Sequence, residues 1–111
     1  MDKYGLIGYP LGHSFSISYF NQKFADEGIN ARYENFEIPS IDILTEVLDK
    51  NPNLKGLNVT IPYKEKVIPF LDSLSPEARA IGAVNVIRVT HEKNKTILKG
   101  FNSDVIGFTQ S

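Results

Sequence analysis

The chain has 111 residues, 41% of them apolar, and its 12 Lys and Arg residues against 13 Asp and Glu residues give a formal net charge of −1. This length fits one domain, and the near-zero charge provides no electrostatic footprint for nucleic acid or for a lipid surface. Cysteine is absent, which excludes disulfides, thiolate metal sites and thiol nucleophiles. The N-terminal residues lack the apolar stretch of a signal peptide, and no apolar run is long enough to span a bilayer. We therefore expect a cytoplasmic protein.

Five short runs of apolar and β-branched residues predict strands. Pro10 and Gly12 follow the first run and Pro62 follows the third, where proline ends a strand because it has no N–H to donate to the ladder. The four polar residues 92–95 between the last two runs predict a hairpin turn. The predicted strands cover residues 4–8, 31–38, 55–60, 84–90 and 96–99.

Helices are predicted where apolar residues recur at spacings of three and four behind a capping residue. Ile17, Phe20 and Phe24 form one such apolar face, and Gly28 ends that helix. A capping serine, a proline and a carboxylate at 75–77 mark another helix start. The predicted helices are one from Ser14 or Ser16 to Gly28, one from Ser40 to Asn51, a short one over 64–71 interrupted near Pro69, one from Ser75 to Gly82, and one that begins at Asp104.

The order of these elements, β-α-β-α-β-α-α-β-β, predicts an α/β domain of three layers. Its mixed sheet is mostly parallel, carries one antiparallel hairpin strand and is flanked by helices. In open α/β sheets, ligands bind beyond the carboxyl ends of the strands. Polar residues stand there at 13–16, 58–64 and 102–104, and Asn85 stands at the start of a later strand. We expect these segments to converge on one cleft.

Lys64 and Asp104 are the residues best suited to proton transfer. Burial lowers the pKa of a lysine toward about 7 to 8, and a nearby carboxylate opposes that shift while orienting the ammonium. Each residue also has a structural interpretation. Lys64 is then a solvated lysine on a polar loop, and Asp104 is the cap of the last helix.

Ser14 and Ser16 lie two residues apart after the first strand, and their hydroxyls suit an anionic ligand such as a carboxylate. Capping of the following helix is the alternative role for both. No base is placed by the sequence to activate either hydroxyl, which argues against a serine nucleophile.

The remaining candidate motifs predict neither a metal nor a nucleotide in this chain. His13 and His91 are isolated from each other and have no cysteine near them, so no metal-ligand spacing exists. Gly5, Gly8 and Gly12 match neither the dinucleotide-binding pattern nor the Walker pattern. We interpret them as turn and close-packing glycines.

Four segments stand out together: residues 8–16 (GYPLGHSFS), 58–64 (NVTIPYK), 81–85 (IGAVN) and 100–108 (GFNSDVIGF). They resemble motifs of the shikimate dehydrogenase (shikimate 5-dehydrogenase) family. The second is similar to the family's N-V-T-x-P-x-K motif and the fourth to its G-x-N-T-D-x-x-G motif. Together they span most of the chain in the family's order.

The resemblance implies a two-domain enzyme that reversibly reduces 3-dehydroshikimate to shikimate with NADPH, on the route through chorismate to the aromatic amino acids. Residues 1–111 would form the substrate-binding domain. NADP would be bound by a Rossmann domain absent from this chain, which itself would hold no cofactor and no metal. The only ligand implied here is the small-molecule substrate, with no nucleic acid or membrane partner, and a homodimer is compatible with the family.

The resemblance also implies a role for each matched residue. Ser14 and Ser16 would hold the substrate carboxylate, and Lys64 and Asp104 would form the catalytic pair. A ketone that becomes an alcohol must gain a proton on its oxygen, and a positioned ammonium supplies both charge stabilisation and the proton. The residues that would bond the ring hydroxyls are Asn58, Thr60, Asn85 and Asp104.

Two alternatives stay open. One is a quinate/shikimate dehydrogenase of the same family, and the other is a small-molecule-binding module without catalysis. The sequence departs from the family where Ile17 and Phe20 replace its usual Pro and His, and where Ser103 replaces a Thr but keeps the hydroxyl. These departures affect helix packing and the surroundings of the site, and so bear on substrate preference.

Overall fold

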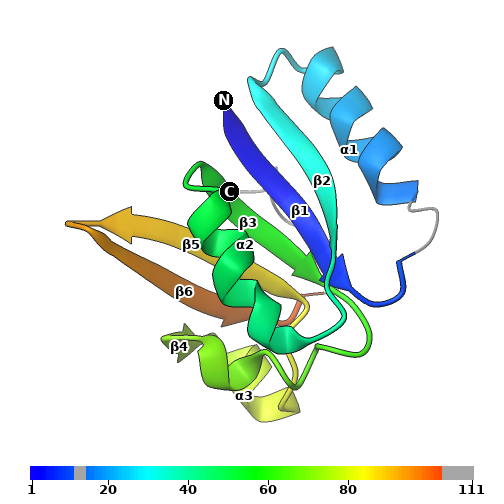
Figure 1. Ribbon diagram of the computed structural model, residues 1–111. Coiled ribbons are helices and arrows are strands. Elements are labelled where there is room, and N and C mark those ends of the chain that lie inside the picture. Colours follow the sequence, from blue (N-terminus) through cyan, green and yellow to red (C-terminus); the bar gives the residue numbers. More distant parts are fainter. Residues whose placement is uncertain (12–14, 104–111) are drawn as a thin grey trace.

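Six strands form one mixed sheet, in the order β2-β1-β3-β5-β6-β4, in the computed structural model (Figure 1). The structure describes residues 1–11 and 15–103. β5 runs antiparallel to its neighbours β3 and β6, whereas all other pairs are parallel, as predicted. The strands are β1 (Asp2–Gly8), β2 (Ala31–Glu37), β3 (Leu54–Val59), β4 (Ser73–Leu74), β5 (Val86–Glu92) and β6 (Lys95–Phe101).

Helices cover both faces of this sheet, which confirms the three-layer prediction. On one face α1 (Phe15–Asp26) buries Phe20 and Phe24 in an aromatic cluster with Tyr33 of β2. On the other face α2 (Leu44–Lys50) and α3 (Pro76–Ile81) pack on a larger, mainly aliphatic core. None of the helices in the described part of the chain is long and apolar enough to cross a membrane.

The irregular pattern of residues 31–38 is explained by burial on both faces of β2. Tyr33 points into the aromatic cluster beneath α1, whereas Phe36 and Ile38 pack against the larger core on the other face. Because a strand alternates its side chains, a strand covered on both faces shows no simple alternation of polar and apolar residues. The strand itself was predicted correctly.

The turns and caps follow the sequence in two places. Ser75 caps α3 through its Oγ, which accepts the N–H of Ala78 at 3.2 Å, and Gly82 ends the helix with a left-handed φ of +79°. Lys93 and Asn94 at the β5–β6 turn both have positive φ, 43° and 69°, as a two-residue hairpin of type I′ requires.

The prediction of a short helix over 64–71 was wrong. Turns occupy 64–67 and a single 3-10 turn follows as η2 (Ile68–Phe70), because Pro69 lacks the N–H that an α-helix would use there. The two-residue strand β4 was not predicted, since two residues carry no periodicity. The helix predicted from Ser40 is divided between the 3-10 helix η1 (Ile41–Ile43) and α2.

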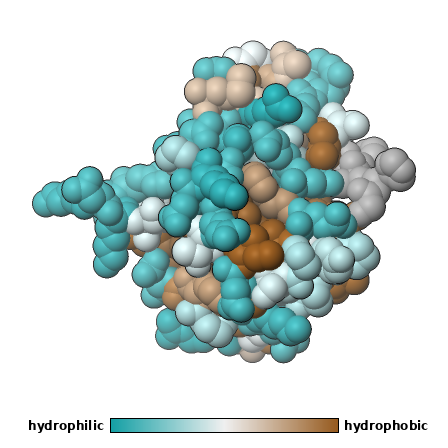
Figure 2. Space-filling view, viewed as in Figure 1, coloured by the Kyte–Doolittle hydropathy of each residue, from teal (hydrophilic) through white to brown (hydrophobic). Residues whose placement is uncertain are grey.

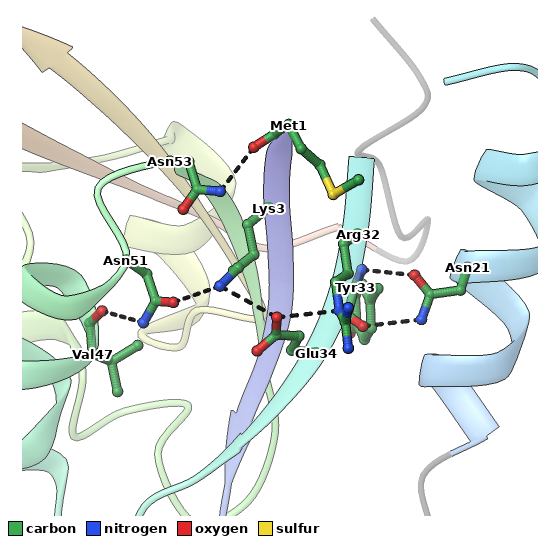
Figure 3. Close-up of polar contacts among 9 residues, drawn as sticks. All are labelled: Met1, Lys3, Asn21, Arg32, Tyr33, Glu34, Val47, Asn51 and Asn53. Atoms are coloured by element: carbon green, nitrogen blue, oxygen red, sulfur yellow. Dashed lines mark hydrogen bonds and ion pairs between the residues drawn. The ribbon is translucent and has the colours of Figure 1, made fainter. Parts of the chain in front are cut away.

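Polar side chains at the amino end of β1 bond to one another and join three elements (Figure 3). Lys3 Nζ lies 3.2 Å from a carboxylate oxygen of Glu34 in β2 and donates to Asn51 Oδ1 at 2.8 Å. Arg32 Nε reaches the same oxygen of Glu34 at 3.3 Å. We call Lys3, Arg32, Glu34 and Asn51 the amino-edge cluster. It ties β1 and β2 to the C-terminal end of α2.

The face seen in Figure 2 is mainly hydrophilic, and its hydrophobic residues are confined to small patches. The large apolar side chains of the described residues that remain exposed include Tyr9, Ile61 and Ile81. Tyr9 follows β1 directly, and Ile61 is the second residue after β3. Some of the exposed apolar surface therefore lies at the carboxyl edge of the sheet.

Candidate functional site

The strand ends meet at the carboxyl edge of the sheet through consecutive backbone hydrogen bonds. The N–H of Thr60, after β3, donates to Ile7 of β1 at 3.0 Å. The N–H of Val59 donates to the carbonyl of Asn85 at 2.8 Å, and the N–H of Asn85 donates to Phe101 of β6 at 3.0 Å. The structure thus brings together segments that lie between 16 and 53 residues apart in sequence.

Asn58 and Thr60 point to the same face of the sheet, the one that α1 covers. Asn58 is only 7% exposed, and its Nδ2 donates to the hydroxyl of Tyr33 at 2.9 Å. Thr60 is half-buried, and its methyl group lies where a Cβ on Gly8 would stand. Gly8 is therefore needed so that β1 and the Thr60 side chain can approach each other.

The loop that carries Lys64 is anchored on both sides. Tyr63 is buried, and its hydroxyl donates to the carbonyl of Ile38, while burial raises the pKa of this phenol above its ordinary value. The carbonyl of Lys64 accepts the N–H of Val84 at 2.7 Å. The Lys64 side chain itself is exposed. Its predicted partner Asp104 lies outside the described residues, so the pair stays a prediction.

The Asn85 side chain holds the segment that follows β6. Its Oδ1 accepts the N–H of Ser103 at 3.0 Å and its Nδ2 donates to the carbonyl of Ser103 at 2.6 Å. Beside it, Asn102 Nδ2 donates to the carbonyl of Ala83 at 3.1 Å. The amide that was predicted to bind substrate thus fixes the backbone next to Asp104. One of its two Nδ2 hydrogens is not needed for this contact.

The two predicted serines follow β1 in the sequence. Ser14 lies outside the described residues, and for Ser16 the structure describes the backbone alone, in the first turn of α1. β1 ends at Gly8 at the carboxyl edge, and α1 begins at Phe15. Their contact with a carboxylate stays a prediction.

The glycines of β1 serve close packing and do not form a phosphate cradle. A Cβ on Gly5 would lie 2.7 Å from the carbonyl oxygen of Glu34 and would overlap the ring of Phe36. The space that a nucleotide phosphate would need beside Gly5 is thus filled by β2. In the part of the chain that the structure describes, no group of three or more His, Asp or Glu residues could hold a metal ion.

Sequence reasoning missed one residue at this site. Tyr33 was assigned only to a strand, yet its hydroxyl is the partner of Asn58. The available signal was the phenol itself, because a buried tyrosine hydroxyl usually has a hydrogen-bond partner. Which residue that partner is depends on the strand order, which brings β2 and β3 to the two sides of β1.

Comparison with known proteins adds to this geometry. A family model described as the shikimate dehydrogenase substrate binding domain matches residues 6–87. The chain is 50% identical to the shikimate dehydrogenase (NADP(+)) of Syntrophomonas wolfei, over 96% of this chain and 36% of that protein. It is 49% identical to the shikimate dehydrogenase (NADP(+)) of Halothermothrix orenii, over 94% and 35%. The chain thus spans about a third of the length of these curated relatives.

Solved structures with the same fold include two informative cases. The dehydroquinate dehydratase and shikimate dehydrogenase of S. pombe AroM matches with a TM-score of 0.84 and 40% identity, over 91% of this chain and 19% of that one. Shikimate 5-dehydrogenase from Thermus thermophilus, in complex with shikimate, matches with a TM-score of 0.77 and 32% identity, over 92% and 38%.

Proposed function

Because the chain belongs to the family of shikimate dehydrogenase substrate binding domains, we propose that it binds the substrate of an NADP-dependent shikimate dehydrogenase. The enzyme would interconvert 3-dehydroshikimate and shikimate in aromatic amino-acid biosynthesis. The observation that carries this proposal is the polar edge where Asn58, Thr60 and Asn85 come together beside the Lys64 loop. A relative that matches over 92% of this chain was solved with shikimate bound.

Each polar group at this edge has a proposed partner on the substrate. Shikimate carries a carboxylate at one end of its ring and hydroxyls at the other. Ser14 and Ser16 would bond the carboxylate, as two hydroxyl donors can. The ring hydroxyls would be bonded by the amides and hydroxyl of Asn58, Thr60 and Asn85, together with Asp104.

Lys64 and Asp104 would move the proton. Reduction turns a ketone into an alcohol, so the oxygen must gain a proton, and the Lys64 ammonium would donate it and stabilise the developing negative charge. The Asp104 carboxylate would hold that ammonium in position. Support for this role comes from the anchored Lys64 loop, whose exposed side chain stands at the same edge as Asn85.

The nucleotide would be bound outside these 111 residues. This proposal is supported by the packed glycines of β1 and by the relatives, which are named for NADP(+) and are about three times as long. Residues 1–111 would then form the substrate-binding domain, and a Rossmann domain would follow. The cytoplasmic location and the homodimer stay predictions.

The direct test is the formation of NADPH by the complete protein that carries these residues, with shikimate and with quinate as competing substrates. We expect turnover of shikimate. A higher kcat/KM for quinate would favour the quinate/shikimate alternative, and shikimate binding without any NADP-dependent turnover would favour the non-catalytic module.

A second measurement uses the 111-residue chain alone. In an amide NMR titration, shikimate should bind weakly and move the signals of Ser14, Ser16, Asn58, Thr60 and Asn85. NADP should move none of them. Saturable binding of NADP to this chain would contradict the proposed division of the two sites.

A further inference from the structure

The hydroxyl of Tyr33 reaches the candidate site across a whole strand. Tyr33 lies on β2 and Asn58 on β3, and both strands flank β1, so their backbones stand about 10 Å apart. Tyr33 is 1% exposed, and its hydroxyl accepts a hydrogen bond from Asn58 Nδ2 at 2.9 Å. This bond is a side-chain contact between two elements that are not neighbours in the sheet.

Asn58 needs such a partner to present its amide in one orientation. The terminal torsion of an asparagine side chain has a broad energy profile, so rotation of the amide plane is cheap. An amide offers two N–H donors and one carbonyl acceptor, and the Tyr33 bond uses one of the donors. With that donor fixed, the directions of the other N–H and of Oδ1 are fixed too.

Tyr33 is itself held rigidly by α1. Its ring stacks on Phe20, with centroids 4.6 Å apart and planes inclined by 23°. Its backbone N–H donates to Asn21 Oδ1 at 2.9 Å, and its carbonyl accepts from Asn21 Nδ2 at 3.1 Å (Figure 3). Phe20 and Asn21 both belong to α1, whose first turn holds Ser16.

We propose that Tyr33 is a positioning residue of the substrate site, acting through Asn58. It fixes the orientation of the Asn58 amide and ties β3 to α1 through its contacts with Asn58 and Phe20. The inference rests on the proposed function for the identity of the ligand. Since Tyr33 holds a group that binds substrate and does not transfer a proton, its loss should weaken binding and spare the chemical step.

The test is Tyr33→Phe in the complete protein. The KM for shikimate should rise about 3- to 10-fold, the effect of one lost neutral hydrogen bond, with kcat nearly unchanged. The matched control is Tyr4→Phe, which removes a hydroxyl from the same aromatic cluster, where Tyr4 packs on Phe24 with centroids 5.7 Å apart. The control should keep the wild-type KM. A wild-type KM in Tyr33→Phe overturns the proposal.

A double-mutant cycle separates positioning from simple structural support. In an Asn58→Ala background, Tyr33→Phe should produce no further rise in KM, because the group it positions is gone. A full additional rise would mean that Tyr33 only supports the fold. Thermal unfolding of each variant confirms that the compared proteins are folded.

A readout that needs no substrate distinguishes failure of this inference from failure of the proposed function. The side-chain amide protons of Asn58 should exchange slowly with solvent in the wild type, and their NMR signals should shift in Tyr33→Phe but not in Tyr4→Phe. Fast exchange in the wild type, or unmoved signals in Tyr33→Phe, would overturn the positioning role. A complete protein that shows these signals but does not turn over shikimate would contradict the proposed function instead.

Discussion

The two edges of the sheet use polar residues in opposite ways. At the amino edge, Lys3 pairs with Glu34 and donates to Asn51, so a cation, an anion and an amide bond to one another. At the carboxyl edge, the Lys64 side chain is exposed and Asn85 keeps a hydrogen beyond its contact with Ser103. The same residue types bond to one another at one edge and keep exposed or partly bonded groups at the other, where we propose that the ligand binds.

The difference has a physical cause in the ends of parallel strands. At the carboxyl end the described segments after β1 and β3 bond to each other, and the segment after β6 bonds to Asn85. At the amino end, Lys3 of β1 lies directly against β2 and the end of α2. Polar side chains that find partners within the fold gain stability and lose the capacity to bind. Polar groups that stay exposed or only partly hydrogen-bonded beyond the carboxyl ends of the strands keep the capacity to bind a ligand.

The largest effect on kcat should appear when each of the two lysines is replaced by methionine in a separate variant. In the complete protein, Lys64→Met should lower kcat by about 10²- to 10⁴-fold, because it removes the proposed proton donor and keeps a side chain of similar length. Lys3→Met is the matched control at the amino edge. It should keep kcat and lower the free energy of unfolding by about 1 to 2 kcal/mol, since it breaks a partly buried pair and a hydrogen bond. Equal kcat values in the two variants would contradict the comparison.

The next test concerns Asp104, which would complete the pair. Asp104→Asn removes the charge but caps a helix equally well. A catalytic Asp104 should lose most of kcat on this change, whereas a purely structural cap would keep it. The double variant with Lys64→Met should be little worse than the worse single variant, because paired groups act as a unit. Steady-state kinetics with saturating shikimate measures both outcomes.

Replacing Ser14 and Ser16 together by Ala should have a smaller effect, mainly on KM. The substrate carboxylate would be held in the same way in the ground state and in the transition state. Loss of the two serine hydroxyls should therefore weaken substrate binding with little change in kcat. Each bond to a charged group is worth about 1.5 to 3 kcal/mol, and the two do not add fully. An unchanged KM would return both serines to helix capping.

The smallest effect, a change in how stability depends on pH, should appear at Tyr63. Its hydroxyl already has a hydrogen-bond partner in the carbonyl of Ile38. Burial raises the pKa of Tyr63 above its ordinary value of 10.0, so the folded state holds the phenol proton more tightly than the unfolded state. This contribution to stability is full below pH 10.0 and is lost as the pH rises through the higher folded pKa. Chemical denaturation across alkaline pH should therefore show a shallower fall for Tyr63→Phe than for the wild type. Parallel curves would contradict this.

Local chemistry made much of the fold predictable from the sequence. The caps of α3 at Ser75 and Gly82, the hairpin turn at Lys93 and Asn94, and the apolar face of α1 all depend on residues within a few positions of one another. The helix expected over 64–71 failed because Pro69 inside it lacks the N–H of an α-helix, and because the buried Tyr63 before it bonds to Ile38. The proline is a local signal, whereas the contact of Tyr63 with Ile38 joins distant segments and no local pattern encodes it.

The sequence by itself determined the α/β layering, the single antiparallel strand and the polar segments that end the strands, because periodicity and turn chemistry act at short range. Only the tertiary structure decided that the Asn85 amide holds Ser103 and that Asn58 bonds Tyr33. Both contacts join elements distant in sequence, and they exist only because the strand order sets β2 and β3 on the two sides of β1 and brings β5 beside both β3 and β6. The physical reason is that hydrogen bonds between side chains depend on strand order and register, which arise from packing the whole sheet at once.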